Sequence, residues 1–228
     1  MKKLLSAIIA FLFFTNAFSQ NISKITITGT GSINAFTFGL DDYVKLNITK
    51  DGNISTWGYD RFEARGEENY NEKLDPYVGR VEYYSQDADA AFRGKIKFIG
   101  RVQLTYFASY ENDAFKGKLK SIGYNTIEYY QSYDNEAYRG NIKSIGQQAI
   151  TWYPSFENEG LRGKLKSIGN TELTYYSAYE DKAYKGKIKS IGGYRFTYYS
   201  SFELYSGSMK TGSSVQLVNA IKYYARNF

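Results

Sequence analysis

Hydrophobic and polar residues alternate along most of the chain, and one alternating pattern returns at a constant interval of 23 residues. Its clearest copy, residues 174–192, contains an aromatic pair, a short acidic turn, an aromatic-basic-glycine step and a Lys-Ile-Lys-Ser-Ile-Gly ending. A hydrophobic period of two predicts strands, and two alternating stretches with two turns fill one interval. We therefore predict that each repeat is one β-hairpin and that successive hairpins form an elongated antiparallel meander. The first glycine of the repeats lies at Gly94, Gly117, Gly140, Gly163 and Gly186.

The alternation also predicts which face of the sheet is buried. In the first strand of a repeat, Leu104 and Tyr106 share one face and Phe107 lies on the other, because successive side chains point to opposite sides. The same rule places Leu119 and Ser121 together in the second strand, with the neighbouring lysines opposite them. We expect the aliphatic face to be buried. Its aliphatic and aromatic pairs are Leu104/Tyr106, Ile127/Tyr129, Ile150/Trp152, Leu173/Tyr175 and Phe196/Tyr198.

The region before the repeats, residues 20–76, is not clearly repetitive. Two alternating stretches, 44–48 and 54–57, flank Asp51 and Gly52. An Asp-Gly step between alternating stretches is a strong signal for a β-hairpin. We predict an N-terminal β-hairpin cap over residues 20–76, followed by the tandem repeats over residues 77–212.

The end of the chain, residues 213–228, changes its hydrophobic period. Val218, Ile221, Ala225 and Phe228 are spaced by three and four residues, and a Ser-x-x-Gln step at Ser213 is typical of a helix start. We predict a short amphipathic helix that caps the last edge of the sheet. A final strand is the alternative, because residues 221–224 resemble the strand of a repeat.

The first 19 residues have the pattern of a secretory signal peptide: Lys2 and Lys3, an apolar run, and the small residues Ala17 and Ser19 before a cleavage site. The apolar run is too short to span a bilayer as a helix. We predict a secreted or periplasmic protein, with association at the cell surface as an alternative. No integral membrane helix is expected.

The composition narrows the possible chemistry. The chain contains no cysteine and no histidine, which excludes lipid anchoring at cysteine, disulfides, Ser-His-Asp catalysis and zinc sites built from these residues. The formal charge of +6 is mild for 228 residues, and export further argues against nucleic acid. Acidic turns such as Glu111 and Asp113 have oxygens that suit calcium, but ordinary turn chemistry explains them more simply. We predict no catalytic function, cofactor or metal, and a monomer.

The segment 184–192 resembles a MORN repeat: it shares the aromatic-x-Gly-x-hydrophobic opening, a glycine that closes the hairpin and the 23-residue period. The resemblance covers roughly residues 77–212. MORN repeats form an elongated, twisted antiparallel sheet and serve mainly as scaffolds or binding surfaces. The resemblance therefore implies a binding or structural role for this chain rather than catalysis.

The second aromatic of each pair is the first candidate for binding. Tyrosine combines a flat apolar face with a polar end and suits sugar rings or a partner's apolar surface, although stacking that only stabilises the sheet is an alternative. Lysines on the same face could contact an anionic partner, or only solvate the sheet. The unknown partner is a protein or a polysaccharide; a carbohydrate-binding adhesion module and an outer-membrane β-barrel are alternative functions. The candidate residues are Phe107, Tyr130, Tyr153, Tyr176, Tyr199, Lys118, Lys164 and Lys187.

Overall fold

The computed structural model describes residues 21–41, 43–69 and 72–225. Within these ranges the chain forms nineteen strands in three sheets and one short 3-10 helix, η1 (Glu63–Arg65). The prediction of an all-β chain of successive antiparallel hairpins is confirmed. The predicted signal peptide lies outside the described residues.

The two ends of the described chain build one six-stranded sheet. All neighbouring strands in it are antiparallel except β1 and β19, which run parallel. In spatial order the strands are β18 (Val215–Val218), β19 (Ile221–Ala225), β1 (Ile22–Ile27), β2 (Ile33–Gly39), β3 (Val44–Ile48) and β4 (Ile54–Tyr59).

The repeats build an eleven-stranded antiparallel sheet in which every strand pairs with its neighbours in sequence. A further pair, β16 (Thr197–Tyr198) and β17 (Met209–Thr211), continues the pattern as a separate two-stranded sheet. The strands of the large sheet are β5 (Val81–Tyr83), β6 (Ile96–Ile99), β7 (Val102–Tyr106), β8 (Leu119–Ile122), β9 (Asn125–Tyr129), β10 (Ile142–Ile145), β11 (Gln148–Trp152), β12 (Leu165–Ile168), β13 (Thr171–Tyr175), β14 (Ile188–Ile191) and β15 (Tyr194–Arg195).

Each repeat contains a β-bulge at its second lysine. Between β7 and β8, Thr105 pairs with Ser121 while Tyr106 pairs with Leu119, so Lys120 has no partner of its own. The same shift recurs in every repeat from β5 to β17. The extra residue reverses the alternation within the strand. The prediction that Leu119 and Ser121 share a face is therefore wrong: Leu119 is buried, and the Ser121 hydroxyl lies 2.6 Å from that of Thr105.

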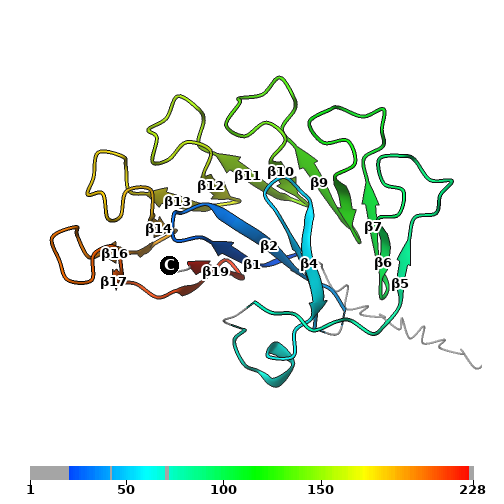
Figure 1. The fold of residues 1–228 in the computed structure, drawn as a ribbon, viewed down its shortest axis with the longest axis horizontal. Coiled ribbons are helices and arrows are strands. Elements are labelled where there is room, and N and C mark those ends of the chain that lie inside the picture. The colour runs from blue at the N-terminus through cyan, green and yellow to red at the C-terminus, as the bar shows by residue number, and fades with distance from the viewer. Residues whose placement is uncertain (1–20, 42, 70–71, 226–228) are drawn as a thin grey trace, which may run out of the picture.

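The core lies between the two large sheets. In Figure 1 the strands of the repeats fan around β1–β4, and their long loops point outward along one rim. Phe36 of β2 meets Trp152 of β11 edge to face, with ring centroids 6.4 Å apart. The predicted buried pairs, including Leu104 with Tyr106 and Ile150 with Trp152, all lie in this core. The N-terminal strands thus cover one face of the repeat sheet.

Two turns of the six-stranded sheet attach it to particular repeats. The carbonyl of Lys50, in the predicted β3–β4 hairpin, accepts a hydrogen bond from the Ile142 amide at 2.9 Å. The carbonyl of Thr30, in the β1–β2 turn, accepts one from Lys164 Nζ at 2.7 Å. The repeat pattern would place lysine at position 141, but the chain has the shorter Asn141 there, which fits the close approach of the β3–β4 turn.

The predicted C-terminal helix is wrong, and the alternative of a final strand is confirmed. Residues 215–225 form the hairpin β18–β19, whose turn contains Asn219 and Ala220 with positive φ angles of 49° and 65°. Buried residues in β19 alternate as Ile221, Tyr223 and Ala225, which is the period of a strand. Pairing with β1 supplies backbone hydrogen-bond partners that an isolated sequence cannot reveal. Phe228 lies outside the described residues.

Candidate binding surfaces

The buried ladder of aromatic residues is a structural feature. Tyr129 Oη donates to the Leu119 carbonyl at 2.7 Å, and Trp152 Nε1 donates to the Ile142 carbonyl at 2.8 Å. Tyr106 and Tyr175 likewise donate to the equivalent carbonyls, those of Ile96 and Leu165, in the preceding repeats. Burial raises the pKa of these tyrosines well above the usual value. These rings therefore join each repeat to the one before it and are not available to a partner.

The structure brings the predicted binding aromatics into one row, but it does not leave them open. Tyr153 is buried, and the other four are half-buried. Tyr130 Oη donates to the Ile150 carbonyl at 3.1 Å and Tyr176 Oη to the Phe196 carbonyl at 2.8 Å, each in the following repeat. Tyr153 makes the equivalent bond to Leu173. These hydroxyls join successive hairpins. Binding through this row, which also contains Phe107 and Tyr199, stays a prediction.

The lysines divide into two sets. Lys118 donates to the Gly140 carbonyl at 2.7 Å in the next repeat, and its Nζ lies 5.5 Å from the centre of the Tyr129 ring. Lys164 and Lys187 make the same contacts with Gly186 and Gly207. The second lysine of the repeat sits at the bulge and covers the second aromatic: Lys189 Nζ lies 5.0 Å from the centre of the Tyr176 ring.

The predicted lysine residues therefore do not form one freely solvated stripe. Lys118, Lys164 and Lys187 are half-buried. Removal from water lowers the pKa of all three, and brings that of Lys164 to about 8. Their ammonium groups lie against backbone carbonyls and tyrosine rings. An anionic partner would find them already engaged.

The long loops of the repeats are tied to one another through one side chain each. Asn135 Oδ1 accepts hydrogen bonds from the amides of Ala137 and Ser155, both at 3.0 Å, and so joins its own turn to the next loop. Asp181 does the same with Ala183 and Ser201. The residues at this position are Asp89, Asn112, Asn135, Asn158 and Asp181. The acidic and amide residues of the turns thus hold the loops in line.

A second row of aromatic residues, missed by the sequence analysis, stands at the tips of these loops. Its five members are between 82% and 95% exposed. They lie 23 residues apart, so the repeat period itself was the signal that could have revealed them. The loop-tip row consists of Tyr110, Tyr133, Phe156, Tyr179 and Phe202.

A carboxylate follows each aromatic of the loop-tip row. Glu180 lies 3.2 Å from Lys189 Nζ, and Glu203 lies 2.9 Å from Lys210 Nζ. The backbone hydrogen bond from Ser200, and then the one from Lys210, lower the pKa of Glu203 to about 2. In the seven-residue segments that start at each tip aromatic, the net charge is −1 in four loops and zero in the loop of Tyr179. Lys189 and Lys210, which pair with two of these carboxylates, lie beyond the counted segments and balance part of this negative charge.

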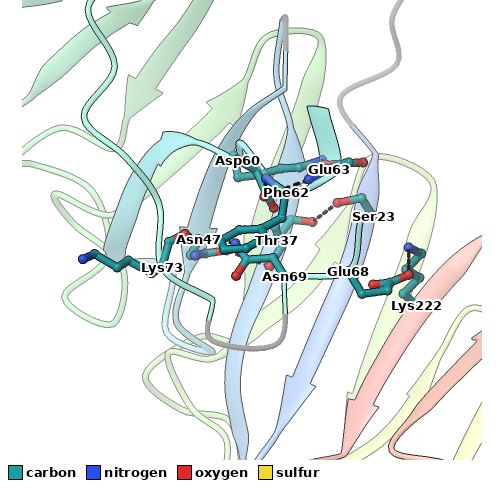
Figure 2. Close-up of polar contacts among 11 residues, drawn as sticks. Ser23, Thr37, Asn47, Asp60, Phe62, Glu63, Glu68, Asn69, Lys73 and Lys222 are labelled. Carbon is teal, nitrogen blue, oxygen red and sulfur yellow. Dashed lines mark hydrogen bonds and ion pairs between the residues drawn. The ribbon is translucent and has the colours of Figure 1, made fainter. Parts of the chain in front are cut away.

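A cavity of about 230 Å³ lies on the other side of the six-stranded sheet, beneath residues 60–69. Figure 2 shows its polar contacts: Ser23 Oγ donates to the Thr37 carbonyl at 3.1 Å, and Lys222 lies 2.6 Å from Glu68. Asp60 Oδ1 accepts the amides of Phe62 and Glu63 and so fixes the start of the short helix η1. Lys45 pairs with Glu63. Most charged side chains that line this cavity therefore already form ion pairs or hydrogen bonds with other residues of the protein.

Metal-binding clusters and membrane-spanning helices are both absent from the described ranges. These ranges contain no group of three or more His, Cys, Asp or Glu placed to hold a metal ion. None of their helices has the length and apolarity needed to cross a membrane.

Comparisons with protein-family models, curated proteins and solved structures found no match. The resemblance to MORN repeats therefore stays a prediction.

Proposed function

We propose that the protein is an exported, non-enzymatic binding protein, and that the loop-tip row is the surface with which it holds a polysaccharide. The observation that supports this proposal is the exposure of five aromatic side chains at one-repeat intervals on the same rim. Side chains that are more than 80% exposed bury little apolar area and add little to the free energy of folding. Exposed aromatic groups in a regular row are typical of contact surfaces.

The chemistry of the rim favours binding over catalysis. A carboxyl group that acts as a general acid needs a raised pKa, usually because it is buried. The carboxyl group of Glu203 has a lowered pKa. The carboxylates of Glu180 and Glu203 both form ion pairs with lysines. Such groups suit hydrogen bonding to a ligand's hydroxyls rather than proton transfer.

Two expectations from the sequence agree with this proposal. The pattern of residues 1–19 directs the chain out of the cytoplasm, where polysaccharides are common ligands. The resemblance to MORN repeats implies a binding or scaffold role for residues 77–212. The proposal places the contact on the loops rather than on the half-buried row from Phe107 to Tyr199.

The test is a variant in which all five residues of the loop-tip row are changed to alanine. We expect the wild-type protein to be retained by at least one member of a panel of immobilised neutral and anionic polysaccharides, and the variant to lose retention. Tyr124→Ala is the matched control, because Tyr124 is 93% exposed in the β8–β9 turn at the opposite end of the strands. Far-UV circular dichroism checks the fold of both variants. Equal retention of the wild type and the five-alanine variant contradicts the proposal, as does a wild type that no polysaccharide retains.

A further inference from the structure

We infer that the cavity on the outer face of the six-stranded sheet is a second binding site, and that it binds a small organic cation with an ammonium or guanidinium head and an apolar body. The inference does not depend on the loop-tip row, because the residues that line the cavity belong to the six-stranded sheet and to residues 60–69.

The cavity has a floor of strands and a roof from another segment. Its floor crosses five neighbouring strands, from Lys45 of β3 through Thr37 of β2 to Leu217 of β18. Residues 60–69 form the roof, and Figure 2 shows Asn69 beside Thr37 there. Both of these polar residues are at least nine-tenths buried. The cavity is therefore built into the fold, as preformed ligand sites are.

Asp60 is the most buried charged residue at the cavity, with 6% of its surface exposed. Its Oδ1 accepts the amides of Phe62 and Glu63 at 3.1 and 3.2 Å. Its Oδ2 accepts no hydrogen bond from the residues that the structure describes, and neither oxygen forms an ion pair with them. Burial of a carboxylate without a counter-charge is costly. A cation in the cavity would supply that counter-charge.

Two further acceptors at the cavity lack a donor within the described part of the chain. Asn69 Nδ2 donates to the Lys73 carbonyl at 3.0 Å, which directs Oδ1 away from that carbonyl and leaves it unpaired. Glu67 is exposed at the edge of the roof, and its carboxylate has no basic partner there. Because these groups and Asp60 Oδ2 all accept hydrogen bonds, the matching group on a ligand is a donor.

Each of the three lysines at the cavity already pairs with a carboxylate. The pairs are Lys24 with Glu72, Lys45 with Glu63, and Lys222 with Glu68. Asp60 and Glu67 therefore leave a surplus of negative charge. An anionic ligand would be repelled by these two carboxylates and would have to displace a carboxylate to reach a lysine, whereas a cation would be attracted.

The opposite end of the cavity is apolar. Val215, Leu217 and Ala220 of the β18–β19 hairpin line it. Three strands separate β18 from β3, and the Asp60 amide bonds to the Tyr43 carbonyl beside β3, so the acidic and apolar ends are distinct. A ligand with its charged head at Asp60 and its apolar body directed towards β18 matches both ends. The volume of about 230 Å³ limits it to a small molecule.

The experiment compares three probes that share one apolar body, by isothermal titration calorimetry with the full chain at neutral pH. The head group is positive in 4-phenylbutylamine, neutral in 4-phenylbutanol and negative in 4-phenylbutanoate. We expect the amine to bind, the alcohol to bind roughly 10-fold more weakly or worse, and the acid to show no measurable binding. The reason is that hydrogen bonds to charged groups are stronger than neutral ones.

Three variants test whether the amine lies in this cavity. Asp60→Asn keeps an oxygen for the start of η1 but removes the charge, and should weaken binding of the amine by roughly 10-fold or more. Glu67→Gln and Leu217→Ser change exposed residues at the two ends, and each should weaken it by roughly 2- to 5-fold. Tyr124→Ala is the control and should leave the affinity unchanged.

The opposite results overturn the inference. Equal binding of the amine and the alcohol means that the site does not recognise charge, and preference for the acid means that the lysines face the ligand. If no probe binds, or if all three variants bind the amine like the wild type, the cavity is not a site for such cations. Should far-UV circular dichroism show that Asp60→Asn does not fold, the two exposed variants decide the question. None of these results bears on the retention of polysaccharides by the loop-tip row.

Discussion

At the scale of single residues, the same amino acid has two different roles within one repeat. Lys164 donates to the carbonyls of Thr30 and Gly186 and lies over the buried Tyr175 ring, whereas Lys166 occupies the bulge and lies over Tyr153. The two positions are only two residues apart, and an unbroken strand would give them one environment. The bulge separates them, because it turns the residues that follow it to the other face.

The burial of Lys164 predicts a dependence of stability on pH. Its pKa in the folded protein is about 8, below the usual 10.5, because burial disfavours the charged form. Between these values the unfolded chain binds more protons at this position than the folded chain does, so this group makes stability increase with pH. We expect the free energy of unfolding of the wild type, relative to Lys164→Met, to rise by about 1–3 kcal/mol between pH 7 and pH 10, after allowance for partial solvation.

Urea denaturation of both proteins at the two pH values gives this difference directly. The tyrosines that titrate near the upper pH are common to both proteins, so their effect cancels. Lys166→Met is the control, since Lys166 lies at the exposed bulge position. A difference between wild type and Lys164→Met that stays constant with pH would show that Lys164 keeps its ordinary pKa in the folded protein.

At the scale of strands and turns, period-two patterns predicted the hairpins well. The Asp-Gly signal at Asp51 marked β3–β4 correctly, and the 23-residue interval marked the pairs in the repeat sheet. Two predictions failed for reasons that involve a second segment of chain. Lys120 bulges because Thr105 pairs with Ser121 and Tyr106 with Leu119, which leaves Lys120 without a partner. Residues 221–225 are extended because they pair with the edge of β1.

The candidate surface was predicted only in part for a similar reason. Tyr130 and Tyr176 look free in the sequence, but their hydroxyl groups reach carbonyls of the next repeat. Tyr133 and Tyr179 lie in segments whose sequence indicates only a turn, and exposure there depends on how far a loop projects from the sheet. The interval of 23 residues was visible for both rows, whereas their burial depends on tertiary contacts.

The β3–β4 turn provides a test of how closely the two sheets fit. Gly52 has a φ of +80°, and a Cβ atom on it would lie 1.9 Å from Tyr129 Oη and 2.5 Å from Cζ of the same ring. Gly52→Ala should therefore lower the free energy of unfolding by about 2–5 kcal/mol, through backbone strain and displacement of a buried ring.

Gly66→Ala is the matched control for this change. Gly66 has a similar φ of +75°, but nothing lies within 4 Å of its added Cβ. Gly66→Ala should therefore lower the free energy of unfolding only through backbone strain, by about 1 kcal/mol. Chemical denaturation of the two variants measures both losses. Similar losses at Gly52 and Gly66 would mean that the turn can move away from Tyr129 at little cost.

At the scale of the whole molecule, the two large sheets share one core. Phe36 and Trp152 meet across it, and Asn219 of the last hairpin donates to Thr171 Oγ1 of β13 at 2.9 Å. Neither sheet can lose its partner without exposing apolar side chains to water. Tandem repeats commonly unfold in parts, because each contacts only its neighbours. In this protein the six-stranded sheet, which lies inside the fan of repeats, contacts several repeats at once.

Because the two large sheets share one core, we predict that they unfold together in a single transition. The chain has two tryptophans: Trp57 belongs to β4 in the six-stranded sheet and Trp152 to β11 in the eleven-stranded repeat sheet. Trp57→Phe and Trp152→Phe therefore each leave one fluorescent reporter in a known sheet. We expect each fluorescence curve to have the same midpoint as far-UV circular dichroism on the same variant. If either reporter changes at a lower denaturant concentration than the dichroism does, the sheets unfold separately.

The attachment of two inner turns to particular repeats has a consequence for how such a chain can evolve. Open arrays of repeats lengthen or shorten readily, because a gained or lost copy only adds or removes a neighbour. In this chain the turn at Lys50 meets Ile142, and the turn at Thr30 meets Lys164, one repeat further on. A copy duplicated between these points would move one anchor by roughly 10 Å while the inner sheet kept its length. The number of repeats is therefore set by the length of the six-stranded sheet.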